Sequence, residues 1–244
     1  MASMMELSDE LGTAALSRGD YKEARKQFRY MVKESRKYGE KEQAGAWNRL
    51  GTACTREGRF KEAEEAFRTS LDLTEHFYGT AHPAVGVESN NLAFVLWKGF
   101  GDRAKAKVLF EKSVQLAESA MPFASDTSAE HIDQYAECFE NLAMLLADEG
   151  DRISAEKRLR QALKIKVDAL GNSSPMVFRT LLKLTDFLDK QGRSKESKAL
   201  LHEFLPASQR PAARDDSAGG PDASDYPAGA PAAPDDSPAR PNAR

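Results

Sequence analysis

Apolar positions along most of the chain recur at spacings of three and four, which is the spacing of one face of an α-helix. Ala63, Phe67 and Leu71 follow this rule, and so do Leu159 and Ala162. No segment shows the strict alternation of apolar and polar residues that is typical of a half-buried strand. The pattern therefore predicts an all-α fold.

A short motif of glycine and small residues repeats five times along this helical part. In each copy a small residue follows a glycine after five positions, and a large apolar residue comes four positions later. The glycines are Gly19, Gly58, Gly101, Gly150 and Gly192, and the large residues are Phe28, Phe67, Phe110, Leu159 and Leu201. A glycine adopts a positive φ at low cost and so ends a helix, while the small residue lets two helices approach closely. The motif predicts five helical hairpins.

Upstream of each glycine, the first helix of the hairpin carries a large residue followed by a small one. The pairs are Leu11-Gly12, Leu50-Gly51, Leu92-Ala93, Leu142-Ala143 and Leu184-Thr185. We expect the five hairpins to span about residues 5–43, 44–85, 86–133, 134–176 and 177–205. Each hairpin can bury its apolar face only against its neighbours, so the five should stack around a continuous core.

This pattern resembles the tetratricopeptide repeat family, most clearly in the second unit. The matching residues there are Trp47, Leu50, Gly51, Gly58, Phe60, Ala63, Phe67 and Pro83. Trp47 and Ser89 are 42 residues apart, which exceeds the usual repeat of about 34 residues. The linkers at residues 78–83 and 170–175 are alike in sequence. They make these units similar to the elongated repeats of kinesin light chains. The resemblance implies a right-handed superhelical solenoid whose first helices line the concave face.

The last 39 residues of the chain have a different composition. Residues 206–244 contain eight of the eleven prolines and no Leu, Ile, Val or Met. Such a segment has too little apolar surface to offset the entropy of ordering the chain. We therefore expect a folded domain over 1–205 and a disordered, Pro/Ala/Asp-rich tail over 206–244.

Charge and hydropathy exclude several classes of protein. The net charge of −3 is unfavourable for binding a nucleic-acid backbone. No apolar run approaches the length of about 20 residues that a membrane-spanning helix needs, and no secretory signal is visible at the N-terminus. The only cysteines are Cys54 and Cys138, which is typical of a reducing compartment. We expect a cytoplasmic protein.

No constellation of residues in the sequence supports catalysis. The four histidines form no His-Glu-x-x-His pair, and the two cysteines are 84 residues apart. Gly99-Phe100-Gly101 follows a helix, and no Gly-Lys-Ser/Thr follows it, so it is better explained as a turn than as a phosphate-binding loop. We expect no enzymatic activity, no cofactor and no metal ion.

The residues that should face the groove follow from the core positions of the first helices. If Leu92 and Ala93 face the core, the opposite stripe of that helix faces the groove. Asparagine amides can pair with the backbone of an extended peptide, and aromatic side chains supply buried contact area. By resemblance, Asn90 and Asn91 match an asparagine pair in the groove of kinesin-light-chain-like repeats. The candidate partner-binding residues are Asn48, Thr52, Arg56, Asn90, Asn91, Phe94, Trp97, Lys98, Asn141 and Met144.

Two alternatives remain open at this point. Phe94 and Trp97 could pack against neighbouring hairpins, and Asn91 could form hydrogen bonds within the stack. The interpretation is an adaptor or scaffold that binds a peptide or helix of a partner protein in its concave groove. The alternative is a homo-oligomeric scaffold that pairs through uncapped ends of the solenoid, since the last hairpin would expose Leu200, Leu201 and Phe204.

Overall fold

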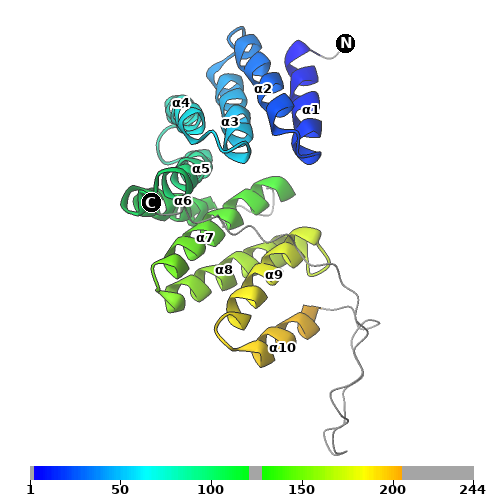
Figure 1. The fold of residues 1–244 in the computed structure, drawn as a ribbon, viewed down its shortest axis with the longest axis vertical. Helices are drawn as coiled ribbons and strands as arrows, with labels where there is room; N and C mark the ends of the chain where they lie inside the picture. Colours follow the sequence, from blue (N-terminus) through cyan, green and yellow to red (C-terminus); the bar gives the residue numbers. More distant parts are fainter. Residues whose placement is uncertain (1–2, 121–127, 205–244) are drawn as a thin grey trace, which may run out of the picture. The chain divides into compact units, whose positions relative to one another are not determined.

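The computed structural model describes residues 3–120 and 128–204, and the tail predicted over 206–244 lies outside them. These residues form ten helices and no strand, as the periodicity predicts. In chain order the helices are α1 (Met4–Ser17), α2 (Tyr21–Ser35), α3 (Glu40–Arg56), α4 (Phe60–Tyr78), α5 (Pro83–Phe100), α6 (Arg103–Ala120), α7 (Ala129–Asp148), α8 (Arg152–Leu170), α9 (Pro175–Asp189) and α10 (Ser194–Phe204) (Figure 1). None of these helices is both long and apolar enough to cross a bilayer.

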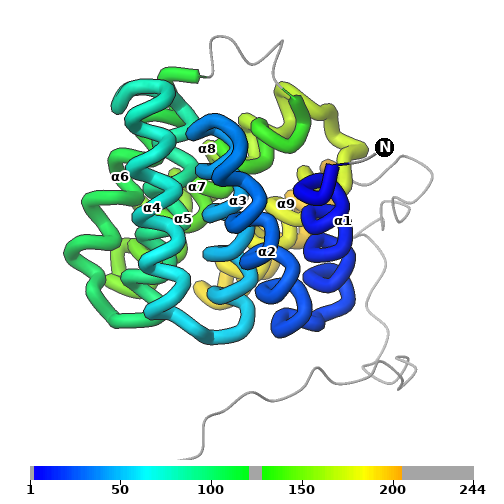
Figure 2. Tube along the Cα trace, turned by 90° about the horizontal axis from the view of Figure 1, so that it is seen from above, coloured from blue at the N-terminus to red at the C-terminus, as the bar shows by residue number. Residues whose placement is uncertain are grey.

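The ten helices form five hairpins that stack in chain order. Within each hairpin the odd-numbered helix packs on the even-numbered helix that follows it, and the latter packs on the first helix of the next hairpin. Contacts also join α3 to α5 and α5 to α7, so first helices of successive hairpins are neighbours. Figure 2 shows the same stack from above. Because contacts are confined to near neighbours along the chain, the fold is a helical solenoid.

The repeated glycine ends the first helix of each hairpin, as the motif predicts. Gly58 has a φ of +78°, a conformation that L-residues with a side chain rarely adopt. This turn lets the Arg59 N–H donate to the Cys54 carbonyl oxygen at 2.8 Å, which caps the end of α3. The chain then reverses direction and begins α4.

The small residue on the first helix is needed for close packing within the hairpin. A Cβ atom added at Gly51 would lie 2.7 Å from the Phe67 ring, and one added at Gly12 would lie 2.4 Å from the Phe28 ring. Both rings are buried. The ring of the second helix thus lies directly on the backbone of the first helix, which explains the spacing that the sequence repeats.

The first helices begin one to five residues before the predicted hairpin boundaries, because the residues that precede their first turns lie further upstream. The Ser128 hydroxyl accepts a hydrogen bond from the backbone N–H of His131, at the start of α7. The Ser174 hydroxyl accepts one from Met176 at the start of α9. A side-chain acceptor at this position stabilises the first turn of a helix, so the helix extends to it.

The exposed apolar surface at the ends of the stack differs from the prediction, which placed it at the C-terminal end. Leu200, Leu201 and Phe204 are half-buried and pack against the core. At the other end, α1 exposes a stripe of large apolar side chains at helical spacing. Those side chains are Met4, Leu7 and Leu11, with exposed fractions of 52%, 41% and 47%. The more apolar surface therefore lies at the N-terminal end.

Candidate partner-binding groove

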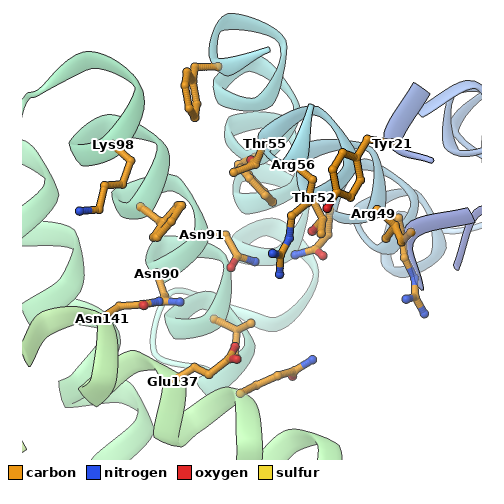
Figure 3. Close-up of a pocket in the computed structure, with 17 residues that line it drawn as sticks. Tyr21, Arg49, Thr52, Thr55, Arg56, Asn90, Asn91, Lys98, Glu137 and Asn141 are labelled. Atoms are coloured by element: carbon orange, nitrogen blue, oxygen red, sulfur yellow. The ribbon is translucent and has the colours of Figure 1, made fainter. Parts of the chain in front are cut away.

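A groove with a volume of about 680 Å³ lies between successive first helices, with most of its lining from α3, α5 and α7 (Figure 3). Eight of the ten candidate residues line this groove. They are Asn48, Thr52, Arg56, Asn90, Asn91, Phe94, Lys98 and Asn141. The structure thus brings together residues that lie up to 93 positions apart in the sequence.

The other two candidates, Trp97 and Met144, line a second pocket of about 400 Å³ formed by α5, α7 and α9. Trp97 is only 5% exposed, and its ring lies edge-to-face with Phe110 at 6.3 Å between centroids. The Lys98 ammonium lies 3.4 Å from the centroid of the Trp97 ring and borders both pockets. Trp97 is therefore a core residue with little free surface.

Side chains on adjacent first helices are joined at equivalent positions of the repeat. Arg49 Nε lies 2.9 Å from Asp9 Oδ1, and Asn141 Nδ2 donates to Asn90 Oδ1 at 3.1 Å. At the equivalent positions of the next junction, Lys183 forms an ion pair with Glu140. We call these three contacts the inner-face bonds. They join α1 to α3, α5 to α7 and α7 to α9.

The junction between α3 and α5 lacks an inner-face bond. Asn48 and Asn91 occupy the two positions, but Asn48 Nδ2 donates instead to both carboxylate oxygens of Glu88 at 2.9 Å. Glu88 is buried, and burial raises its pKa to about 7, against the opposing effect of the Asn48 and Ser70 hydrogen bonds. The Asn91 amide is half-buried and makes no side-chain hydrogen bond within residues 3–120 and 128–204. It is left facing the groove (Figure 3).

Asn90 has a different role from the one predicted for it. Its side chain is only 4% exposed, and its amide oxygen accepts the bond from Asn141. The asparagine pair of α5 is therefore divided, because one amide holds the stack together and the other is free of it.

Three charged side chains of the groove lack a partner of opposite charge within the part of the chain that the structure describes. Arg56 and Lys98 lie in the last turns of α3 and α5, where the helix dipole favours positive charge. Glu137 on α7 also lines the groove. Burial raises the pKa of Glu137, and the nearby carboxylates of Asp133 and Glu140 raise it further. Sequence analysis missed Glu137, since the equivalent position on α5 is Val87 and gives no signal.

A buried cluster of charges joins α7, α8 and α9 just beyond the groove. Lys166 Nζ lies 2.9 Å from Glu140 Oε1 and 2.6 Å from Asp133 Oδ1. The Thr180 hydroxyl donates to Glu140 at 2.5 Å. Burial alone would raise the pKa of Glu140, but Lys183 and Lys166 hold it below its usual value. This cluster could not be predicted from the sequence, because its members have the pattern of surface charges on three separate helices.

The described residues offer hydrogen bonds and charge but no nucleophile or metal site. Burial raises the pKa of the Cys54 thiol to about 11 and that of the Cys138 thiol to about 12, so both stay protonated at neutral pH. In the part of the chain that the structure describes, no group of His, Cys, Asp and Glu side chains could hold a metal ion.

Comparisons with known proteins agree with this fold. Two family models described as tetratricopeptide repeat match residues 42–119 and 136–175. Among curated proteins, none matches the sequence. The chain is similar to the crystal structure of BtubC (BKLC) from P. vanneervenii, at 17% identity and a TM-score of 0.62 over 81% of this chain and 76% of that one.

Two further solved structures are similar. One is a putative kinesin light chain of Podosopora anserina with nearly identical TPR-like repeats, at 20% identity and a TM-score of 0.60 over 84% of this chain and 95% of that one. The other is a Rap protein complexed with competence and sporulation factor, at 13% identity and a TM-score of 0.66. The match covers 82% of this chain, which spans about half (52%) of the Rap protein. At these identities the similarity shows the fold alone. The chain thus carries tetratricopeptide repeats over residues 42–119 and 136–175.

Proposed function

We propose that this protein is a non-enzymatic adaptor that binds an extended segment of a partner protein in the groove between α3, α5 and α7. Tetratricopeptide repeats form a scaffold for protein–protein interaction, and the proposal assigns that role to one surface. The observation that carries it is the free amide of Asn91. Three junctions between first helices close with an inner-face bond, and the remaining one leaves a hydrogen-bonding group facing the groove.

The geometry suits a peptide backbone. A carboxamide has donors and an acceptor, so Asn91 can bond both the C=O and the N–H of one ligand residue in an extended conformation. Phe94 lines the same groove on the next turn of α5 and is half-buried, so a ligand side chain can bury apolar surface against it. The two buried thiols support the proposal that the protein is not an enzyme. The proposal also includes the reducing, cytoplasmic setting that the cysteine content predicts.

The test is selection of peptides from a random display library on the full chain, followed by affinity measurement by calorimetry. A neutral hydrogen bond contributes about 0.5–1.5 kcal/mol, so Asn91→Ala should weaken binding of the selected peptides by about three- to tenfold. The matched control is Asn172→Ala, which removes an exposed asparagine of a linker outside the groove. Equal affinities of the wild type and Asn91→Ala would contradict the proposal.

A second candidate function is self-assembly through an end of the solenoid. The exposed stripe of Met4, Leu7 and Leu11 on α1 supports it, because apolar surface at the end of a stack favours association. Light scattering after size exclusion tests it. An assembler should dissociate to monomers in the Leu7→Glu/Leu11→Glu variant, and a wild-type chain that is already monomeric at high concentration would rule this function out.

A further inference from the structure

We infer that the partner segment carries acidic side chains that bind Arg56 and Lys98, and a cationic side chain, about five residues away, that binds Glu137. This inference rests on the proposed function and adds to it the chemical class of the ligand. It follows from three charged groups of the groove that have no partner of opposite charge among the residues that the structure describes, and from their places along the helices.

The cationic end of the groove is formed by equivalent positions of two successive repeats. Arg56 and Lys98 each lie six residues after the leucine of the repeated pair, Leu50 or Leu92. Arg56 is exposed and forms no hydrogen bond or ion pair with any described residue. The Lys98 ammonium lies over the Trp97 ring and pairs with no carboxylate among residues that the structure places. Each of the two cations can therefore bind a carboxylate of the ligand without breaking an existing pair.

The anionic end of the groove is Glu137, on the N-terminal half of α7. Its carboxylate forms no hydrogen bond or ion pair within the described ranges. The nearby cations are engaged elsewhere, since Lys166 binds Asp133 and Glu140, and Lys183 binds Glu140. A half-buried carboxylate with two other carboxylates nearby is unfavourable when charged. A lysine or arginine of the ligand would supply the counter-ion that the described residues do not.

The distance between the two ends sets the spacing in the ligand. Glu137 lies five residues before the repeated leucine of its helix, whereas Arg56 and Lys98 lie six residues after theirs. Eleven positions along first helices that run in the same direction correspond to an axial offset of about 16 Å between the backbone positions of the two ends, at a rise of 1.5 Å per residue. An extended peptide covers this distance in about five residues. Asn91 occupies a register position between the two ends, where it can hold the backbone of such a peptide (Figure 3).

The same observations disfavour other charged ligands. A nucleic acid or an entirely acidic peptide would bind Arg56 and Lys98 but would place negative charge beside Glu137. An entirely basic peptide would meet the opposite problem at Arg56. A segment with both charges in a fixed order is the ligand that leaves no group of the groove beside a like charge.

The experiment is selection of 12-residue peptides from a random display library on the full chain and on three variants. Glu137→Gln removes the anionic end, and Arg56→Gln weakens the cationic end. Glu130→Gln is the matched control, because Glu130 is an exposed glutamate of the same helix that does not line the groove. Peptides selected by the wild type should be enriched in a Lys or Arg about five residues from an Asp or Glu.

The variants should change this enrichment selectively. With Glu137→Gln the preference for Lys or Arg should disappear while the preference for Asp or Glu remains, and a selected peptide should bind about tenfold more weakly. With Arg56→Gln the preference for Asp or Glu should weaken, and Glu130→Gln should select the same peptides as the wild type. If a variant fails to fold, neutralising the corresponding charge in a selected peptide tests the same contact with the wild-type chain.

Two results would overturn the inference in different ways. Selected peptides that depend on Asn91 but lack the cationic residue, or show no fixed spacing, would contradict the inference and leave the proposed function standing. A wild-type chain that selects no peptide at all would contradict both.

Discussion

The junctions on either side of α7 use the same positions of the repeat for opposite purposes. Between α5 and α7 the contact joins two amides, Asn90 and Asn141, and the neighbouring Asn91 amide is free. Between α7 and α9 the equivalent contact is an ion pair that belongs to a buried cluster around Glu140. The Asn91 amide of the first region has no side-chain partner among the described residues, whereas both carboxylate oxygens of Glu140 in the second are hydrogen-bonded.

Burial explains why the two regions differ in what they can bind. Glu140 is 1% exposed and accepts from Lys166, Lys183 and Thr180, so a ligand would have to displace a charged donor to reach it. Removing one member of a buried ion pair is costly. The cluster is therefore structural, and the amide region is the binding site that we propose.

The largest effect on stability is expected from disrupting the buried cluster around Glu140. Glu140→Ala leaves the buried Lys166 with Asp133 alone, so the free energy of unfolding should fall by about 4 kcal/mol. Chemical denaturation followed by circular dichroism measures it. The matched control is Asn90→Ala, at the equivalent position of α5, which should cost about 1 kcal/mol. Similar losses in the two variants would show that the regions do not differ in this way.

The junction between α3 and α5 and the cluster around Glu140 should also respond to pH in opposite directions. The folded-state pKa of Glu88 is about 7 against an ordinary value of 4.5, so its contribution to stability falls as the pH rises from 4.5 to 7, by about 3 kcal/mol. The pKa of Glu140 is lowered, so its contribution is present above pH 4.5 and is lost as the pH falls further.

Denaturation curves between pH 4 and 8 test this contrast. Glu88→Gln keeps an acceptor for Asn48 but cannot ionise, so its stability should fall less than that of the wild type between pH 4.5 and 7. If the wild type and the variant change in parallel over this range, Glu88 does not titrate there and the first half of the contrast is wrong.

The smallest effects should distinguish two asparagines at equivalent positions. Asn141→Ala removes the inner-face bond to Asn90 and should lower the free energy of unfolding by about 1 kcal/mol. Asn91→Ala removes no bond within the described residues and should change it by less than about 0.5 kcal/mol. Thermal unfolding of both variants beside the wild type is sufficient. A larger loss from Asn91→Ala than from Asn141→Ala would reverse the assignment of the two amides.

Much of the fold could be predicted from the sequence, because the repeat records contacts between helices that are close in the chain. Gly51 and Phe67 illustrate this, since the small residue and the ring that packs on it recur in phase. The groove could also be located, as most of its lining comes from one helical stripe that the core residues define.

The individual roles within the groove could not be predicted, because they depend on contacts between repeats. Asn90 and Asn91 are adjacent asparagines in the sequence. Asn90 is bonded by Asn141 on α7, whereas Asn48 on α3 bonds Glu88 and leaves Asn91 free. Glu140 is equivalent to Asn90 in the repeat, yet its role depends on Lys166 from the following helix. Trp97 was expected in the groove, but the core beside Phe110 buries it.

The side-chain amide signals of Asn91 and Asn141 in an NMR titration test most directly whether the junction between α3 and α5 is the binding site. In the free protein, the Asn91 amide protons should exchange rapidly with water, and those of Asn141 should exchange more slowly. Adding a peptide selected on the full chain should shift and protect the Asn91 signals and leave those of Asn141 nearly unchanged. Asn91 signals that are already protected in the free protein, or that do not move when peptide binds, would contradict the assignment of this junction as the binding site.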